Sequence, residues 1–164
     1  GPVCAVLDLR MPEISGLELQ KQLVDEGVDI PLFFLSAHGD IPAAVNAMQL
    51  GAADFLQKPF KPQDFLDAVN KVMRIARERY VHRVQQATWQ QRIGKLSARE
   101  IEILEAMKDG LTSKEIARLH GISPKTVDVH RANVLRKMDV GTTAELQRLI
   151  GRQEAIAPGR NRQG

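Results

Sequence analysis

Short apolar runs alternate with amphipathic stretches over the first sixty residues. Runs at 3–7, 32–35 and 53–57 are short, and a polar residue ends each of them, so they predict strands buried on both faces. Apolar residues recur at helical spacing between these runs, and Gly27 and Gly51 close the two predicted helices. This alternation predicts a parallel α/β sheet with right-handed crossovers.

One long amphipathic helix is predicted from Pro62 to about Arg92, because no helix breaker interrupts that stretch. At 1.5 Å per residue it measures about 45 Å, which is too long for so small a domain. We expect its second half to project as a linker that pairs with a copy of itself. The alternative is a helix that folds back on its own sheet. Its apolar stripe consists of Phe65, Val69, Val72, Ala76, Tyr80, Val84 and Ala87.

Capping signals predict four short helices in the rest of the chain. Ser/Thr-x-x-Glu boxes begin at Ser97, Thr112 and Thr142, and Ser123 followed by Pro124 marks another start. The glycine-containing turn His120-Gly121-Ile122 is typical of helix-turn-helix units. The predicted helices cover 97–108, 112–119, 123–138 and 142–150. The predicted domains are 1–70, a helical linker at 71–94, a helix-turn-helix domain at 95–150 with its motif at 112–138, and a disordered tail at 151–164.

The charge distribution follows the same division. Residues 1–70 carry four Lys/Arg against ten Asp/Glu, residues 71–94 carry six against one, and residues 95–164 carry thirteen against nine. A basic second half indicates a polyanionic partner, with a solvated helix surface as the alternative. The single cysteine excludes a disulfide within the chain and fits a reducing cytoplasm. No apolar run is long enough for a transmembrane helix, so we expect no membrane partner.

Three polar residues stand at the predicted strand ends, and they suggest phosphoryl chemistry. Asp8, Ser36 and Lys58 follow the three apolar runs, and ligands of parallel sheets bind outside the carboxyl ends of the strands. A carboxylate can act as a nucleophile, a hydroxyl can bond a phosphoryl oxygen, and a lysine can neutralise phosphate charge. Each residue alone is more simply a surface polar group; together they favour a site.

A helical wheel of residues 123–138 separates a core side from an exposed face. Lys125, Val129, Ala132 and Arg136 lie opposite the apolar side, a composition that suits a major groove. Asp128 lies at the edge of this face, where an acid repels phosphate unless it accepts a hydrogen bond from cytosine. The core side consists of Val127, Val134 and Met138.

The first part of the chain contains Val6-Leu7-Asp8-Leu9-Arg10-Met11-Pro12, Gly16, Leu35-Ser36-Ala37 and Lys58-Pro59-Phe60. These segments resemble the receiver domain of bacterial two-component response regulators. The resemblance implies that Asp8 accepts a phosphoryl group from a sensor histidine kinase, that Ser36 hydrogen-bonds that group and that Lys58 pairs with it. It also implies Mg²⁺ as cofactor, with the backbone carbonyl of Arg10 among its ligands, and Phe55 as the aromatic that changes rotamer on activation. Phe55 as plain core remains the alternative.

The chain also departs from the receiver pattern. Receivers have five strands in the order 2-1-3-4-5, whereas the pattern here begins at the third and lacks the acidic pair that ends the first strand. We therefore expect a partial doubly wound α/β receiver, truncated at its amino end. Its metal site, Asp8 with the carbonyl of Arg10, is expected to be incomplete and to hold Mg²⁺ weakly.

Residues 95–150 are similar to the LuxR-type DNA-binding domain, on the stretches Leu96–Glu100, Gly110–Ala117 and Ile122–Arg131. Together the two parts look like the FixJ/NarL class of transcription factors: a cytoplasmic, homodimeric, non-enzymatic regulator of promoter DNA. The alternatives are a phosphorylation-independent dimerising DNA-binding fragment and, least favoured, an aspartyl-phosphate enzyme, since no second acid follows Asp8. By the resemblance, the residues that approach DNA are Lys125, Thr126, Val129, Ala132, Asn133 and Lys137.

Overall fold

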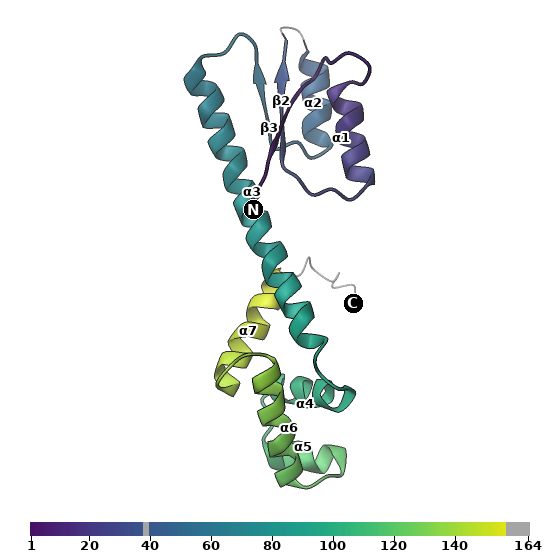
Figure 1. The fold of residues 1–164 in the computed structure, drawn as a ribbon, viewed down its shortest axis with the longest axis vertical. Coiled ribbons are helices and arrows are strands. Elements are labelled where there is room, and N and C mark those ends of the chain that lie inside the picture. Colours follow the sequence, from purple (N-terminus) through teal and green to yellow (C-terminus); the bar gives the residue numbers. More distant parts are fainter. Residues whose placement is uncertain (38–39, 157–164) are drawn as a thin grey trace. The chain divides into compact units, whose positions relative to one another are not determined.

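The computed structural model describes residues 1–37 and 40–156, and these residues form three strands and seven helices (Figure 1). The strand and helix pattern agrees with the predicted order, and the predicted bounds differ from the observed ones by at most two residues, except at the end of the last helix. In chain order the elements are β1 (Ala5–Asp8), α1 (Gly16–Asp25), β2 (Leu32–Ser36), α2 (Ile41–Gln49), β3 (Asp54–Gln57), α3 (Pro62–Ile93), α4 (Ala98–Lys108), α5 (Ser113–His120), α6 (Pro124–Lys137) and α7 (Thr143–Ile156).

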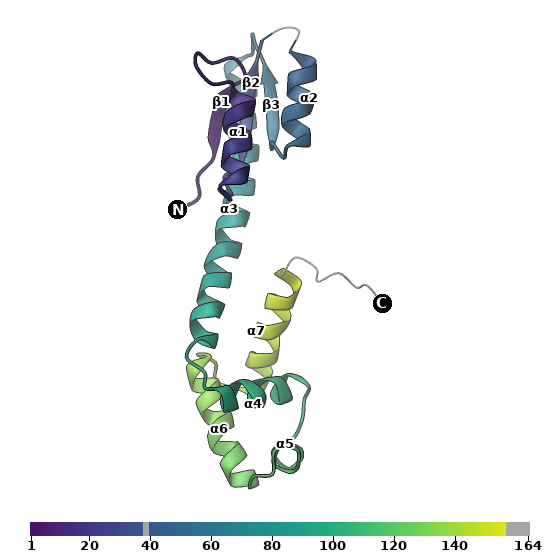
Figure 2. The ribbon, with the colours of Figure 1, turned by 90° about the vertical axis from the view of Figure 1, so that its right-hand side faces the viewer.

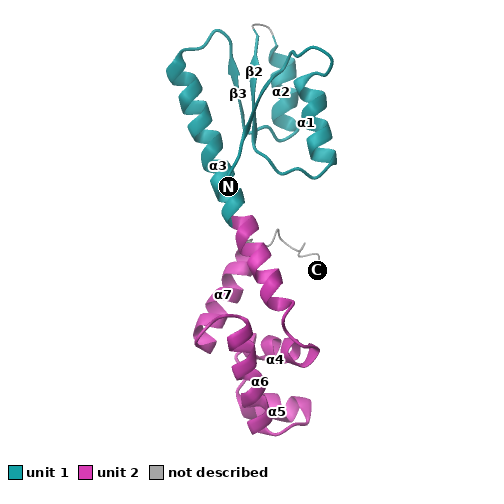
Figure 3. Ribbon diagram, viewed as in Figure 1, with its two compact units in different colours: residues 1–81 teal, residues 82–164 magenta. Residues whose placement is uncertain are grey.

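The chain divides into two compact units, residues 1–81 and residues 82–164, which Figure 3 shows in different colours. The boundary lies inside α3, so the stretch predicted as a linker contributes residues to both units. None of the described helices has the length and apolar character needed to cross a membrane.

Unit 1 is the parallel α/β sheet that the apolar runs predicted. Its strands pair in the order β1-β2-β3, all parallel, and α1 and α2 cover one face while α3 covers the other (Figures 1 and 2). Phe34 packs with Ala44 and Ala47 of α2 on the first face, and Phe33 packs with Val72 of α3 on the second. Adjacent phenylalanines on opposite faces of β2 thus anchor the helices on both sides of the sheet.

Unit 2 is an all-helical domain with a core of its own. Ile103, Met107 and Ile116 are fully buried in it, and so is the apolar side of α6. Trp89 and Ile93 from the last turns of α3 pack against this core. The unit therefore begins before α4, because the end of α3 is part of its packing.

The predicted capping boxes begin their helices with one variation. Ser97 with Glu100 and Thr112 with Glu115 form reciprocal boxes at α4 and α5. At α7, Thr142 Oγ1 accepts from Glu145 N–H, but the Glu145 carboxylate accepts from Gly141 N–H rather than closing the box. Each box satisfies backbone N–H groups that the first turn of a helix leaves unpaired.

Two parts of the structure differ from the sequence prediction. Helix α7 continues to Ile156, so the prediction of a disordered tail is wrong for residues 151–156, and residues 157–164 lie outside the described part of the chain. Helix α3 has the predicted length, but Val72 and Ala76 of its apolar stripe are buried in unit 1. Tyr80 and Val84 are 36% and 46% exposed. Only the second half of the stripe is therefore accessible to a partner.

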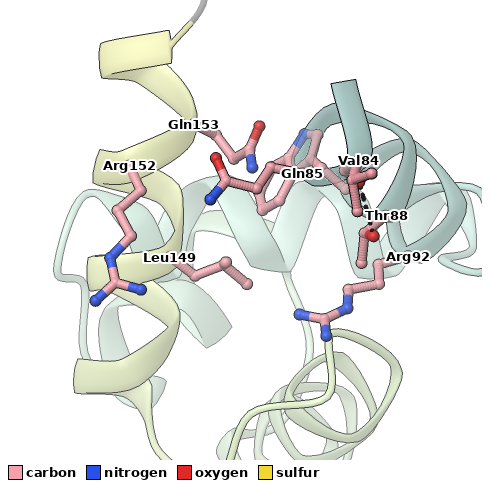
Figure 4. A pocket seen from close by; sticks show the side chains of 8 residues that line it. Val84, Gln85, Thr88, Arg92, Leu149, Arg152 and Gln153 are labelled. Carbon is pink, nitrogen blue, oxygen red and sulfur yellow. Dashed lines mark hydrogen bonds between the residues drawn. The ribbon is translucent and has the colours of Figure 1, made fainter. Parts of the chain in front are cut away.

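A cavity of about 230 Å³ lies within unit 2, between the last turns of α3 and those of α7 (Figure 4). The guanidinium of Arg92 on one side pairs with Asp139 at 3.1 Å, and Leu149 contributes an apolar wall on the other. None of the site residues predicted from the sequence lines this cavity. Its lining consists of Val84, Gln85, Thr88, Trp89, Arg92, Leu149, Arg152 and Gln153.

Candidate functional site

The strand ends of unit 1 bring an acid and a lysine into direct contact. Asp8 is the last residue of β1, and Lys58 follows β3 on the far side of β2. Lys58 Nζ donates to Asp8 Oδ2 at 2.5 Å, and the backbone N–H of Arg10 donates to Asp8 Oδ1 at 3.0 Å. The Lys58 ammonium, with the Arg10 N–H, holds the pKa of the Asp8 carboxyl below its usual value. Asp8 is thus an ionised, partly exposed carboxylate at a sheet edge, as a nucleophile requires.

Ser36 lies on β2, which pairs with β1, and Phe55 lies on β3, which pairs with β2. Ser36 ends β2 and is buried, and its backbone carbonyl accepts from the N–H of Lys58 at 2.7 Å. The peptide bond between Lys58 and Pro59 is cis. Phe55 on β3 is 43% exposed, so it is not part of the core. This exposure excludes the plain-core alternative for Phe55.

Gly16 allows α1 to approach the strand end closely. A Cβ atom at this position would overlap the carbonyl oxygen of Asp8 and lie 2.9 Å from the Phe34 ring. The backbone N–H of Gly16 donates to the carbonyl of Leu9 at 3.3 Å. A glycine is therefore required where α1 begins beside the Asp8 carbonyl.

A second carboxylate near this edge was missed by the sequence reasoning. Asp40 is buried just before α2, and its Oδ1 accepts from Arg10 Nη2 at 2.6 Å and from Arg10 Nε at 3.2 Å. The Arg10 guanidinium holds the pKa of Asp40 below its usual value. The position of Asp40 before a predicted helix was visible in the sequence, but nothing local indicated its partner, thirty residues away.

The residues at this edge supply only some of the oxygen ligands that the Mg²⁺ implied by the receiver resemblance requires. Mg²⁺ prefers octahedral oxygen coordination, generally from one or two carboxylates with water. Asp8 supplies one carboxylate, already bonded to Lys58, whereas Asp40 is engaged by Arg10. Among the described residues, no three His, Cys, Asp or Glu side chains gather closely enough to hold a metal ion. The described residues therefore do not fit a complete magnesium site.

The second candidate site is the exposed face of α6 in unit 2. Lys125, Thr126 and Ala132 are exposed, and Val129 is 56% exposed, while the opposite side of the helix is buried in the core. Asn133 is half-buried at the edge of the face. Lys125 has no bonded partner in the described part of the chain. The face combines a free cation, a hydroxyl and small apolar groups, which matches what a major groove offers.

Lys137 has different surroundings from the other predicted DNA-contacting residues. Its Nζ donates at 2.7 Å to Oε2 of Glu100, a buried carboxylate that also accepts from the backbone N–H of Ser97. The Lys137 ammonium holds the pKa of Glu100 below its usual value. Sequence reasoning found Glu100 as a capping residue but not as the partner of Lys137, which is 37 residues away. The bond joins the end of α6 to the beginning of α4.

Three further hydrogen bonds fix α6 against its neighbours. The guanidinium of Arg131 donates to the carbonyl of Leu111 at 3.2 Å and to Thr143 Oγ1 at 3.3 Å. Ser113 Oγ donates to Asp128 Oδ1 at 2.6 Å, which links the first turn of α5 to α6. These contacts and the core packing hold the exposed face of α6 in a fixed orientation within unit 2.

Comparison with known proteins matches two separate stretches of the chain. The family of response regulator receiver domains matches residues 2–70, and the family of bacterial regulatory proteins of the luxR type matches residues 94–150. The transcriptional regulatory protein TdiR of Thauera aromatica is 43% identical over 149 residues, which are 91% of this chain and 66% of TdiR. The transcriptional regulatory protein FixJ of Azorhizobium caulinodans is 44% identical over 146 residues, 89% of this chain and 69% of FixJ.

A solved structure supports the same similarity. The response regulator StyR superimposes with a TM-score of 0.83 and 43% sequence identity, covering 91% of this chain and 75% of StyR. The chain spans about two thirds of the length of the curated relatives it matches. The activities and partners of those whole proteins therefore support proposals about this chain and do not establish its activity.

Proposed function

Because this chain belongs to the family of transcriptional response regulators that join a receiver domain to a LuxR-type DNA-binding domain, we propose that unit 2 binds duplex promoter DNA with α6 in the major groove. Unit 1 regulates this binding. A role at promoters requires the chain to act in the cytoplasm, where bacterial DNA lies. The proposal describes a binding protein and assigns the chain no enzymatic turnover.

One observation supports DNA binding above the others. The face of α6 that points away from the core combines the unpartnered Lys125 with the exposed Thr126, Val129 and Ala132, and Asn133 lies at its edge. Lys and Asn side chains bond base edges, and small apolar groups contact thymine methyl groups. Lys137 acts indirectly, because its ammonium is bound to Glu100. We therefore assign base reading to the first three turns of α6.

Asp8 is the proposed phosphoacceptor, and a sensor histidine kinase is the proposed donor. An oxygen of Asp8 attacks the phosphorus of a phosphohistidine, and the bond from that phosphorus to the histidine nitrogen breaks. Lys58 is positioned to neutralise charge on the transferred group, since it already bonds Asp8. Ser36 is the proposed hydrogen-bond donor to a phosphoryl oxygen, and Phe55 the proposed switch residue.

The incomplete metal site supports a second candidate function. Receiver domains generally use Mg²⁺ for phosphorylation, and the described residues offer it a single carboxylate, Asp8, which is already bonded to Lys58. A chain with this site is expected to bind DNA without depending on phosphorylation. The two candidates differ in one measurable respect, whether Asp8 is labelled by a phosphoryl donor.

Self-association is part of the proposal. Tyr80, Val81 and Val84 are exposed apolar residues in the middle of α3, and Ile41 and Val45 are exposed on α2 of unit 1. Exposed apolar patches of this kind favour protein contacts. We propose a homodimer in which α3 contributes to the interface.

The experiment that tests DNA binding is a fluorescence anisotropy titration of the 164-residue chain with duplexes of mixed sequence at several salt concentrations. The expected result is a linear fall of log affinity with log salt, because binding releases counterions from phosphates. Lys95→Ala is the matched control for Lys125→Ala, because both remove one exposed lysine from unit 2. Absence of salt-dependent binding to any duplex would contradict the proposal.

A further inference from the structure

Asp128 is an acidic side chain on a helix face that is otherwise suited to a polyanion. It follows Lys125 by three residues and precedes Ala132 by four, so it lies beside both on the surface of α6. It is exposed, and among the described residues no cation pairs with it. A negative charge in this position weakens association with phosphates at every sequence. An acid that carries this cost on a DNA-facing surface needs an explanation other than affinity.

The surroundings of Asp128 hold its carboxylate in a defined orientation. Ser113 Oγ donates to Asp128 Oδ1 at 2.6 Å, and Ser113 is the first residue of α5, directly after the Thr112 cap. The first turn of a helix carries partial positive charge, which favours a carboxylate beside it. Ser113 lies on α5 and Asp128 on α6, so their bond fixes the orientation of the carboxylate relative to α5 and keeps its Oδ1 atom engaged. The second oxygen, Oδ2, has no bonded partner in the described part of the chain.

An oriented carboxylate with one unengaged oxygen is an acceptor. In the major groove, cytosine presents its exocyclic N4 amine as a donor, and Asp or Glu is the side chain that accepts from it. Guanine and thymine present acceptors, which repel a carboxylate, and adenine presents its N6 donor next to the N7 acceptor. The same charge that weakens binding to phosphates therefore favours cytosine over guanine and thymine, and over adenine because the N7 acceptor lies beside the adenine donor. Asp128 therefore lowers the affinity of the face for DNA of any sequence and raises its preference for cytosine at one position.

We propose that Asp128, oriented by Ser113, is a specificity-determining residue of this DNA-binding face and accepts a hydrogen bond from the N4 amine of a cytosine. The inference rests on the proposed DNA-binding function and adds the base that one residue reads. It makes Ser113 a positioning residue, which acts on specificity through Asp128.

The test begins with selection of preferred duplexes from a randomised pool by the 164-residue chain and by Asp128→Asn. Anisotropy titrations then compare each selected duplex with its single-base variants. Asn keeps the size of the side chain but removes its charge and replaces one acceptor oxygen by a donor. Glu105→Gln is the matched control, because it removes one exposed carboxylate from α4 and its nearest cation, Lys108, lies on that same helix.

The wild-type chain is expected to prefer a C·G pair at one position by about 5- to 100-fold over substitutions there. Asp128→Asn is expected to lose that preference and to bind the other duplexes as tightly or more tightly, with the salt dependence unchanged. Ser113→Ala is expected to reduce the preference at the same position. Glu105→Gln is expected to select the wild-type sequence. Trp89 fluorescence during denaturation verifies that each variant is folded.

Two results would overturn the inference, and they are distinguishable. If Asp128→Asn selects the same sequence as wild type and its affinity rises equally for all duplexes, Asp128 contributes charge alone, and DNA binding stands without it. If the wild-type chain binds no duplex in a salt-dependent manner, the proposed function itself fails, and the inference fails with it.

Discussion

At the scale of single residues, Lys137 of α6 is bonded to Glu100 whereas Lys125 is exposed and unpartnered among the described residues, and this predicts different effects of substitution. Lys125→Ala is expected to weaken DNA binding by about 1–3 kcal/mol with altered sequence preference, because it removes a base-edge contact. Its effect on stability is expected to be small, since Lys125 is exposed and unpartnered in the described residues. Lys137→Ala is expected to destabilise unit 2 by about 1–3 kcal/mol, because it leaves the buried Glu100 carboxylate without its cation.

Anisotropy titrations and urea denaturation followed by Trp89 fluorescence separate these two effects. The method is suited to unit 2, because Trp89 is the single tryptophan of the chain and packs against the core of that unit. Equal loss of DNA affinity in both variants at unchanged stability would show that Lys137 also contacts DNA.

The Glu100–Lys137 bond also predicts a dependence of stability on pH. The folded state lowers the pKa of Glu100 below its unfolded value of about 4.3, so its contribution is fully present above that value. The contribution is lost as pH falls through the lower pKa of the folded state. Glu100→Gln is therefore expected to lower the free energy of unfolding by about 1–3 kcal/mol at pH 7, and by less as the pH approaches 3.

The comparison uses urea denaturation at pH 7, 5, 4 and 3, with the exposed Glu105→Gln as control. Glu105→Gln is expected to differ from wild type by less than about 0.5 kcal/mol at each pH. A difference between wild type and Glu100→Gln that stays constant over this range would show that the ion pair does not stabilise unit 2.

Sequence reasoning at this scale was limited by distance along the chain. The Ser97–Glu100 box was predicted because its two residues are three positions apart. The partners Lys137 for Glu100 and Asp40 for Arg10 are 37 and 30 positions away, so no local pattern indicates them. Asp8 and Lys58 were brought together correctly, because the ends of parallel strands meet at one edge whatever their separation.

At the scale of elements, two glycines of unit 2 stand in different backbone conformations and predict opposite effects. Gly121 ends α5 at φ 65°, a left-handed conformation in which a Cβ atom is disfavoured by about 1–2 kcal/mol. Gly151 lies inside α7 with open space around it, where Ala forms a helix better by about 0.8–1 kcal/mol. Gly121→Ala is expected to destabilise unit 2 and Gly151→Ala to stabilise it, as measured by urea denaturation.

Gly151→Ala also tests the end of α7. The sequence prediction ended this helix at residue 150 because glycine and polar residues follow. Gly inside a helix costs only about 1 kcal/mol relative to Ala, and Leu146 and Ile150 anchor α7 in the core, so the helix continues. A loss of stability in Gly151→Ala would contradict a helical conformation at this position.

The exposed part of α3 predicts self-association that specific substitutions remove. Val81→Glu with Val84→Glu places two charges on the apolar residues in the middle of the helix, which are 48% and 46% exposed. The double variant is expected to weaken a homodimer at least about tenfold in sedimentation velocity runs, because buried charges at an interface are costly. Gln86→Glu with Gln90→Glu adds the same charge to the opposite side of the helix and is expected to leave the dimer intact.

A wild-type chain that stays monomeric at micromolar concentration would contradict this prediction. Periodicity alone could not identify the residues to change, because Val72 and Ala76 continue the same stripe but are buried in unit 1. Charges at Val72 or Ala76 would disrupt the fold of unit 1 rather than test an interface. Helical spacing indicates a common face, whereas the partner of that face depends on tertiary packing.

At the scale of the whole molecule, the receiver-like unit predicts limited phosphorylation of the chain as it stands. Two anions must approach each other when Asp8 receives a phosphoryl group, and a metal ion normally offsets their charge. The described residues offer such an ion one carboxylate. Incubation with acetyl phosphate and Mg²⁺ is therefore expected to give substoichiometric labelling in an intact-mass spectrum.

A chimera that extends the chain with an acidic first strand from a receiver relative is expected to be labelled more completely, and Asp8→Asn not at all. Stoichiometric labelling of Asp8 in the 164-residue chain would contradict the expectation and favour phosphorylation-dependent control. Absence of labelling in both versions would count against Asp8 as phosphoacceptor.

The division into two units with separate cores also provides the chain with a spectroscopic ruler. The single tryptophan, Trp89, lies in unit 2, and the single cysteine, Cys4, lies in unit 1 beside β1. A thiol-reactive acceptor dye on Cys4 therefore forms a donor–acceptor pair with the native indole, and no residue has to be replaced. Energy transfer between them measures the distance between the units in solution. Recorded with and without duplex DNA, it measures whether DNA binding changes that distance.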